Sequence, residues 1–291
     1  MRKLAELAIR GPKQATALAV LFACAPMLFW ISAAIISLVI LRRGMSQGVK
    51  VLAWALLPAI AWAAMGQFAT ITGLIATTAL ACVLRQTVSW HKTFLALLPV
   101  GALVALMMAQ LAPQQITMLI LTDIVLKIIS DYLTAGGQST VDIGNWKPLV
   151  EYGVIGMTTW FNLVGCIVGL ILARSWQAQL FNPGGFREEF HGVRLPATTA
   201  LLLMVLALGG LSLAPIMLVI APVVTLPLLL SGLALMHGLV GIRQLGRLWL
   251  VVFYMLLFFV TQLMYPVIII TACLDSLFDF RGRLTAKLHQ G

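Results

Sequence analysis

Charged residues are scarce in this chain. Asp, Glu, Lys and Arg together make up 10% of its 291 residues, whereas hydrophobic residues make up 61%. A soluble domain carries about 25% charged residues, and no polar stretch here is long enough to fold alone, so a soluble enzyme with a membrane tail is excluded. The apolar residues also come in long runs instead of alternating with polar ones, which excludes a β-barrel. The composition therefore predicts an all-α, polytopic helical membrane protein.

The motifs of metal, nucleotide and nucleophile sites are also missing. The four cysteines lie inside apolar runs without paired spacing, and the four histidines are scattered along the chain. There is no His-x-x-x-His, Cys-x-x-Cys, glycine-rich phosphate loop or Gly-x-Ser-x-Gly. We therefore predict no metal, no cofactor and no catalytic residue, and hence a protein that is not an enzyme.

Acidic residues are the rarer of the two charges, since 9 Asp and Glu stand against 19 Lys and Arg. The basic residues lie at the ends of apolar runs, as they do in cytoplasmic loops of membrane proteins. This placement indicates contact with a lipid bilayer and not with nucleic acid. Six of seven basic groups lack matching acids, and we predict that they share the cytoplasmic face. They are Arg2, Lys3, Arg10 and Lys13; Arg42, Arg43 and Lys50; Arg85 and Lys92; Arg174, Arg187 and Arg194; Arg243 and Arg247; and Arg281, Arg283 and Lys287.

The apolar runs predict about seven transmembrane spans, within a range of six to nine, in a single polytopic membrane domain (1–291). The range is open because three runs are too short for two full spans yet must leave and return to one face. A run of 26 residues such as Thr16–Leu41 reaches only about 39 Å as one helix. Each such run is either one tilted span or two short segments, which would meet near Pro26, Gly66 and Pro266.

The first apolar run carries a ladder of small residues, Ala15, Ala19 and Ala23. Their four-residue spacing places them on one helix face, where small side chains let another backbone approach closely. Two interpretations are open. The face packs against other helices of the same chain, or it docks a partner membrane protein.

The seventh basic group, Lys127 and Lys147, lies in the segment 113–151, which also contains four acids. We interpret this segment as extracytoplasmic or interfacial. Within it, Asp123, Lys127 and Asp131 share one face of a helix predicted over Ile116–Ala135. This helix either lies on the outer surface with its charges towards water or presents a charged stripe to a cavity. In the second case Asn145 and Trp146 would complete a ligand site.

The segment 175–196 is predicted to be a cytoplasmic loop with a short amphipathic helix. Asn182-Pro183-Gly184-Gly185 has the chemistry of a turn, and Phe186 and Phe190 then fall on one side of a helix. The helix either meets lipid headgroups or a partner, or it belongs to a solvated loop. Its candidate partner-docking residues are Asn182, Gly184, Gly185, Phe186, Arg187, Glu188 and Glu189.

Three segments resemble the YybS-like family of bacterial membrane proteins, a family of unknown function. They are Leu41-Arg42-Arg43-Gly44, Asn182-Pro183-Gly184-Gly185-Phe186-Arg187-Glu188-Glu189-Phe190 and Leu274-Asp275-Ser276-Leu277-Phe278-Asp279-Phe280-Arg281. The resemblance implies a bacterial inner membrane. That family is distantly similar to the substrate-binding S components of energy-coupling-factor transporters, which dock through small residues of the first helix on a membrane coupling subunit driven by ATPases. The ladder Ala15, Ala19 and Ala23 is positioned like that docking motif.

Two functions follow as expectations. The leading one is a transport-type component that captures a small-molecule substrate in an outward cavity lined by Asp123, Lys127, Asp131, Asn145 and Trp146. The alternative is a non-transporting scaffold or regulator that acts through the Asn182–Phe190 segment. An intramembrane enzyme is third, because it would need ionisable residues clustered deep within the spans.

Overall fold

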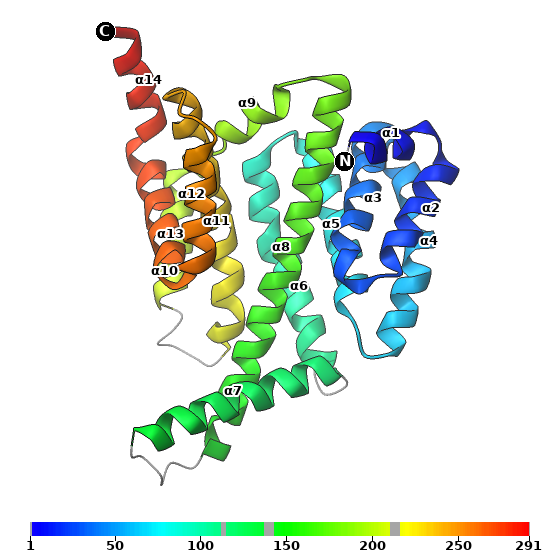
Figure 1. Ribbon diagram of the computed structural model, residues 1–291, viewed down its shortest axis with the longest axis vertical. Helices are drawn as coiled ribbons and strands as arrows, with labels where there is room; N and C mark the ends of the chain where they lie inside the picture. The colour runs from blue at the N-terminus through cyan, green and yellow to red at the C-terminus, as the bar shows by residue number, and fades with distance from the viewer. Residues whose placement is uncertain (1, 112–114, 137–142, 210–215, 291) are drawn as a thin grey trace.

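The computed structural model describes residues 2–111, 115–136, 143–209 and 216–290, and every regular element among them is helical (Figure 1). The prediction of an all-α polytopic membrane protein is confirmed, because seven helices of the described chain are long and apolar enough to span a membrane. The first half of the chain contains α1 (Arg2–Arg10), α2 (Pro12–Ala23), η1 (Pro26–Leu28), α3 (Phe29–Arg43), α4 (Met45–Ala64), α5 (Ala69–Thr87), α6 (Trp90–Leu111) and α7 (Ile116–Ala135). The second half contains η3 (Ile143–Trp146), α8 (Lys147–Phe181), α9 (Gly185–His191), α10 (Ala197–Gly209), α11 (Met217–Ile242), α12 (Leu248–Phe259), α13 (Thr261–Phe278) and α14 (Phe280–Gln290).

The bundle is built from out-and-back pairs of packed helices. These pairs are α2 with α3, α4 with α5, α6 with α8, α10 with α11, and α12 with α13. Each pair starts and finishes at the end of the molecule that carries α1, α9 and α14, at the top of Figure 1. The six basic groups lie at helix ends and turns of this basic end, whereas Lys127 and Lys147 lie on α7 and at the start of α8, at the opposite end. The prediction that the six groups share one face is confirmed.

The broken apolar runs are hairpins. Pro26 opens the 3₁₀ turn between α2 and α3, and Gly66 lies in the turn between α4 and α5 with a φ of +81°. In the last run the reversal lies at Val260 and not at Pro266, so that part of the prediction is wrong. At this break the Thr261 hydroxyl donates to the Leu257 carbonyl over 2.6 Å and so satisfies one carbonyl at the end of α12. Pro266 is accommodated inside α13.

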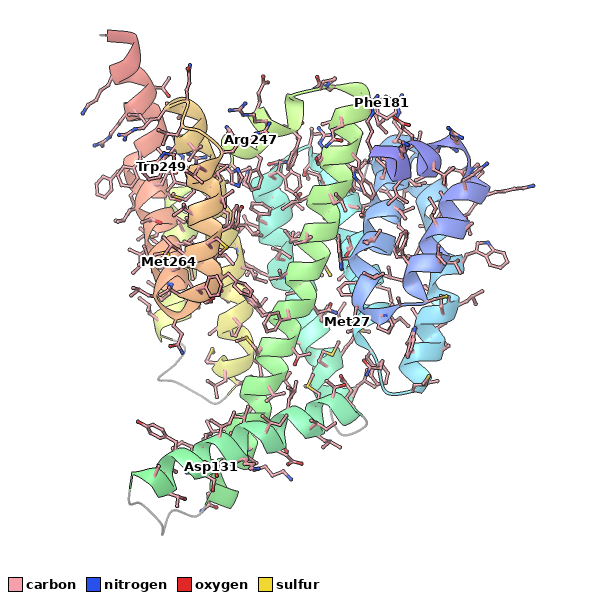
Figure 2. All side chains as sticks on the ribbon, in the orientation of Figure 1. Met27, Asp131, Phe181, Arg247, Trp249 and Met264 are labelled. Atoms are coloured by element: carbon pink, nitrogen blue, oxygen red, sulfur yellow. The ribbon has the colours of Figure 1, made fainter. Side chains whose placement is uncertain are left out.

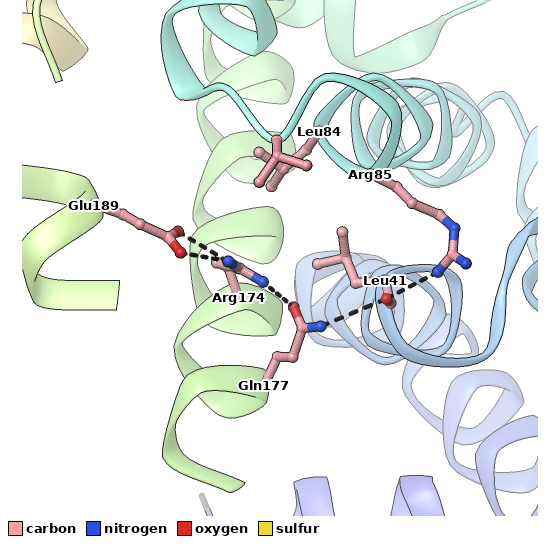
Figure 3. A pocket seen from close by; sticks show the side chains of 7 residues that line it. Leu41, Leu84, Arg85, Arg174, Gln177 and Glu189 are labelled. Atoms are coloured by element: carbon pink, nitrogen blue, oxygen red, sulfur yellow. Dashed lines mark hydrogen bonds and ion pairs between the residues drawn. The ribbon is translucent and has the colours of Figure 1, made fainter. Parts of the chain in front are cut away.

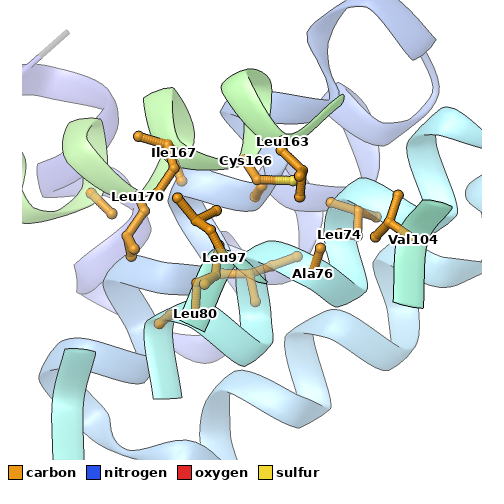
Figure 4. Close-up of a cluster of buried hydrophobic side chains, with 14 of the residues drawn as sticks. Leu74, Ala76, Leu80, Leu97, Val104, Leu163, Cys166, Ile167 and Leu170 are labelled. Atoms are coloured by element: carbon orange, nitrogen blue, oxygen red, sulfur yellow. The ribbon is translucent and has the colours of Figure 1, made fainter. Parts of the chain in front are cut away.

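The long helix α8 forms the axis of the bundle and packs against α3, α5, α6 and α11. Its 35 residues extend for about 52 Å. Buried aliphatic side chains of α5, α6 and α8 interdigitate at its centre, among them Leu97, Leu163 and Ile167 (Figure 4). Close packing needs small residues here. A Cβ at Gly169 would lie 2.7 Å from the Trp30 carbonyl oxygen of α3, so this glycine lets the two backbones meet.

The alanine ladder is buried inside the chain. Ala15, Ala19 and Ala23 are at most 1% exposed, and α2 packs against α3 and α4. The Ser32 hydroxyl of α3 donates to the Ala19 carbonyl over 2.8 Å. The ladder therefore serves packing within the protein. The prediction that these three residues dock a partner is corrected, because α3 and α4 already occupy that face.

Candidate functional site

The short helix α9 lies across the basic end of the bundle (Figure 1). Its residues line two cavities, one on each side. The turn that precedes it explains its position. Gly184 has a φ of +94°, a left-handed conformation that glycine adopts without strain. The chain reverses there, and α9 packs back against α8 and α11. The predicted turn and short helix are therefore present.

On one side of α9 a network of polar side chains surrounds a cavity of about 290 Å³ (Figure 3). Glu189 forms an ion pair with Arg174 of α8, and Arg174 donates to Gln177 over 2.6 Å. The carbonyl of Leu41 accepts from Gln177 and, over 2.9 Å, from Arg85 of α5. The donors and acceptors of this network satisfy one another. The residues around this cavity therefore have a structural role, which is to join α3, α5, α8 and α9.

On the other side of α9 lies a cavity of about 930 Å³ between α8, α11 and α12. Its wall is mostly aliphatic along the bundle and polar next to α9. Trp160 lies at the far end of the α8 wall, where its indole N–H donates to the Tyr265 hydroxyl over 3.0 Å. The polar part of the lining consists of Arg187, His191, His237, Arg247 and Tyr254.

A row of rings connects the two sides of α9. Phe186 packs edge-on against Trp90 of α6 and stacks with Phe190, and the Phe190 ring contacts His237 of α11. The His237 Nε2 and the Tyr254 hydroxyl of α12 are 2.8 Å apart and share a hydrogen bond. The two phenylalanines therefore anchor α9, and the His237–Tyr254 pair joins α11 to α12 across the cavity.

The chain end holds α9 in place through a buried ion pair. Asp275 and Arg281 are 1% and 7% exposed and are joined over 2.8 Å. The second Asp275 oxygen accepts the Phe280 N–H over 3.0 Å. Arg281 also donates to the carbonyls of His191, over 2.5 Å, and Val193, over 2.8 Å. All these groups are satisfied, which a buried charge pair requires.

The position of His191 depends on close contact with α11. A Cβ at Gly241 would lie 2.7 Å from the His191 ring and 3.6 Å from Arg187 Nη2, so glycine makes room for both side chains. Burial lowers the pKa of His191, and the charges of Arg187, His237 and Arg281 lower it further. The imidazole is therefore neutral over a wider pH range than in solution.

The segment around α9 thus divides the predicted docking residues into two sets. Phe186 and Glu189 are turned into the protein, and their contacts are described above. Arg42 of α3 lies over the Phe181 ring at 3.9 Å, so all three segments that carry the family resemblance meet at this end. The exposed set comprises Asn182, Gly184, Arg187 and Glu188, with Gly185 half-buried beside them.

The predicted ligand residues near α7 do not line either cavity. This helix lies across the opposite end of the bundle, with Asp131 far from α9 (Figure 2). Asp123, Lys127 and Asp131 are exposed, as are Asn145 and Trp146 of η3. The face of α7 turned to the bundle carries Met118 and Thr122 instead. These five residues therefore do not line the predicted outward cavity. The helix α7 packs against the bundle through its apolar face and leaves its charges outside. Asp142 lies outside the described residues.

Three polar groups that line the larger cavity were not predicted as site residues. His237 and Tyr254 lie inside apolar runs, where core packing is the ordinary interpretation, and Arg247 was predicted only to mark the topology. One signal was present: an isolated histidine inside an apolar run needs a polar partner. Its partner, Tyr254, lies on another helix.

The chain matches no protein-family model, and no curated protein or solved structure is significantly similar to it. The resemblance to the YybS-like family therefore remains a prediction that rests on the three segments.

Proposed function

We propose that this multi-pass membrane protein is a transport-type component that captures a small amphipathic molecule in the cavity between α8, α11 and α12, without catalysis of its own. The proposal rests on one observation. The cavity is of ligand size, apolar along most of its length and polar only beside α9, the composition typical of small-molecule sites. In the described chain no group of three or more His, Cys, Asp or Glu residues is placed to hold a metal ion.

We further propose that the membrane is a bacterial inner membrane and that the basic end faces the cytoplasm. The excess of Lys and Arg at one end supports this orientation. Cysteines introduced at Lys50 and Lys147 test it, since these positions lie at opposite ends of the bundle. With the four native cysteines replaced by serine, a thiol reagent that cannot cross the membrane should label Lys147→Cys in intact cells and Lys50→Cys only after lysis. The reverse pattern would invert the topology.

The capture function is tested by filling the cavity. Leu257 and Leu256 are neighbours on α12, but only Leu257 lines the cavity and Leu256 is exposed. We expect native mass spectrometry of the purified protein to show a bound small molecule that Leu257→Trp removes and Leu256→Trp retains. Equal occupancy in both variants, or no bound molecule under any condition, would contradict the proposal.

The second candidate is a scaffold or regulator that works through the exposed part of the Asn182–Glu188 segment. Its support is that Asn182 in the turn and Glu188 on α9 are both exposed, while the other face of α9 is anchored. We expect Glu188→Arg to abolish recovery of a specific soluble partner if this candidate is right, while ligand occupancy stays unchanged. Loss of occupancy without any partner would favour capture.

A further inference from the structure

We propose that the captured molecule is a phosphate-bearing anionic lipid that enters from the surrounding bilayer. Its headgroup would lie between Arg187 and Arg247, and its hydrocarbon chain along α8 and α11. This inference rests on the proposed capture function and specifies the ligand class of that site.

The charges at the mouth of the cavity are all of one sign. Arg187 belongs to α9 and Arg247 to the turn before α12, which lies at the same end of the bundle (Figure 2). Neither guanidinium forms an ion pair in the described chain, and no acidic side chain is among the residues that line the cavity. Arg187 and Arg247 are exposed, whereas the more buried Arg174 and Arg281 are already paired. Two unpaired arginines that line the same cavity suit a phosphate, which the planar guanidinium binds through two hydrogen bonds.

Below the arginines lies a layer of neutral polar groups. His237 and Tyr254 share their hydrogen bond across the cavity, and the half-buried His191 lies next to Arg187. Such groups suit the ester and hydroxyl oxygens that join a lipid headgroup to its chains, since they donate and accept hydrogen bonds without charge. A hydrocarbon chain without polar atoms would form no hydrogen bonds with these groups.

The apolar part of the cavity has the length of a lipid chain. Its α8 wall extends from Ile171 to Trp160, which is about 17 Å along the helix, and beyond His237 its α11 wall extends from Leu233 to Leu226, about 10 Å. One leaflet of a bilayer provides about half of a ~30 Å hydrocarbon core. A soluble organophosphate would leave most of this length unfilled.

The packing of α12 indicates the route of entry. This short helix packs against α13 and more sparsely against α11, and no comparable contact joins it to α8 in the described chain. Its outer face exposes Phe258 and Phe259 at 76% and 71%, which fits a helix in contact with lipid. The cavity therefore separates α8 from α12 on the lipid side of the bundle, where a lipid enters sideways.

The test is a titration of the full-length protein in detergent, followed by native mass spectrometry. The probes are phosphatidylglycerol, diacylglycerol with the same chains, and glycerol 3-phosphate. We expect phosphatidylglycerol to bind about tenfold to a hundredfold more tightly than diacylglycerol, the contribution of charged hydrogen bonds. Glycerol 3-phosphate should bind far more weakly, because it lacks the chains that fill the cavity.

Arginine variants locate the headgroup. We expect Arg187→Gln and Arg247→Gln each to weaken phosphatidylglycerol binding at least tenfold and to leave diacylglycerol binding unchanged. Arg243→Gln is the matched control, since Arg243 is exposed in the turn that also holds Arg247 but does not line the cavity. Unchanged unfolding temperatures show that all three variants fold.

The outcomes separate the ligand class from the capture function. Equal binding of phosphatidylglycerol and diacylglycerol, blocked by Leu257→Trp, would overturn the phosphate headgroup and leave capture standing. Tight binding of glycerol 3-phosphate alone would overturn the lipid. If none of the probes binds and Leu257→Trp changes nothing in the purified protein, both proposals fall.

Discussion

The two ends of the molecule each carry a helix that lies across the bundle, and they differ in where the charges of that helix go. On α9, Glu189 is paired with Arg174 of α8, and Arg281 from the chain end donates to the His191 carbonyl. On α7, the charges of Asp123 and Asp131 are exposed, and the described chain has no ion pair there. The comparison teaches that charges paired by other elements hold a crossing helix in place, and that charges which only share one helix face, as on α7, do not by themselves make a site.

The largest expected difference between the ends concerns the buried pair. Asp275→Ala leaves Arg281 buried without its carboxylate, and we expect it to lower the free energy of unfolding by about 3–5 kcal/mol. Asp131→Ala on α7 should change it by no more than about 0.5 kcal/mol, because that side chain is exposed. Thermal unfolding in detergent measures both. Similar small changes would remove the distinction between the two ends.

The next largest effect concerns the packing of α9 against α11. Gly241→Ala places a Cβ 2.7 Å from the His191 ring, so we expect α9 to shift at a cost of about 1–3 kcal/mol. Gly246→Ala is the control, since no atom lies within 4 Å of a Cβ there. Limited trypsin digestion at Arg187 should accelerate in the first variant alone. Equal digestion of both would show that α9 does not depend on this contact.

A smaller effect concerns pH. Because the pKa of His191 is lower in the folded protein, the unfolded chain takes up the proton first as the pH falls below about 6.5. The contribution of His191 is therefore fully present above that pH and is lost as the pH falls through the folded pKa. We expect the unfolding temperature to drop between pH 8 and pH 5, and to drop less in His191→Gln. An identical profile in the variant would contradict this.

The smallest effect is expected on α7. The triple variant Asp123→Asn, Lys127→Gln and Asp131→Asn should leave ligand occupancy and stability unchanged, because these exposed side chains line neither cavity. Native mass spectrometry compares it with the parent protein. Loss of the bound molecule in the triple variant would show that the ligand site lies at α7 and not at the end that carries α9.

The helices and their common basic end were predictable from the sequence, whereas the site was not. Charges at helix ends and long apolar runs are local signals, so hairpins near Pro26 and Gly66 could be predicted as one of two alternatives. The reversal at Val260 was predicted at Pro266 instead, because proline is the stronger local signal in this run, yet the structure keeps Pro266 inside α13. The spacing of the small residues of α2 predicts a packing face. Which helices cover that face depends on tertiary contacts, and the spacing does not show it.

The helical membrane class and the common basic end follow from the order of the amino acids alone, because hydrophobicity and charge act residue by residue in a bilayer. Which polar residues meet is set by tertiary contacts. His237, Tyr254, Arg187 and Arg247 lie on three different elements and the turns between them, and no spacing along the chain links them. A binding site is a set of distances between such elements, and those distances are set by how the helices pack.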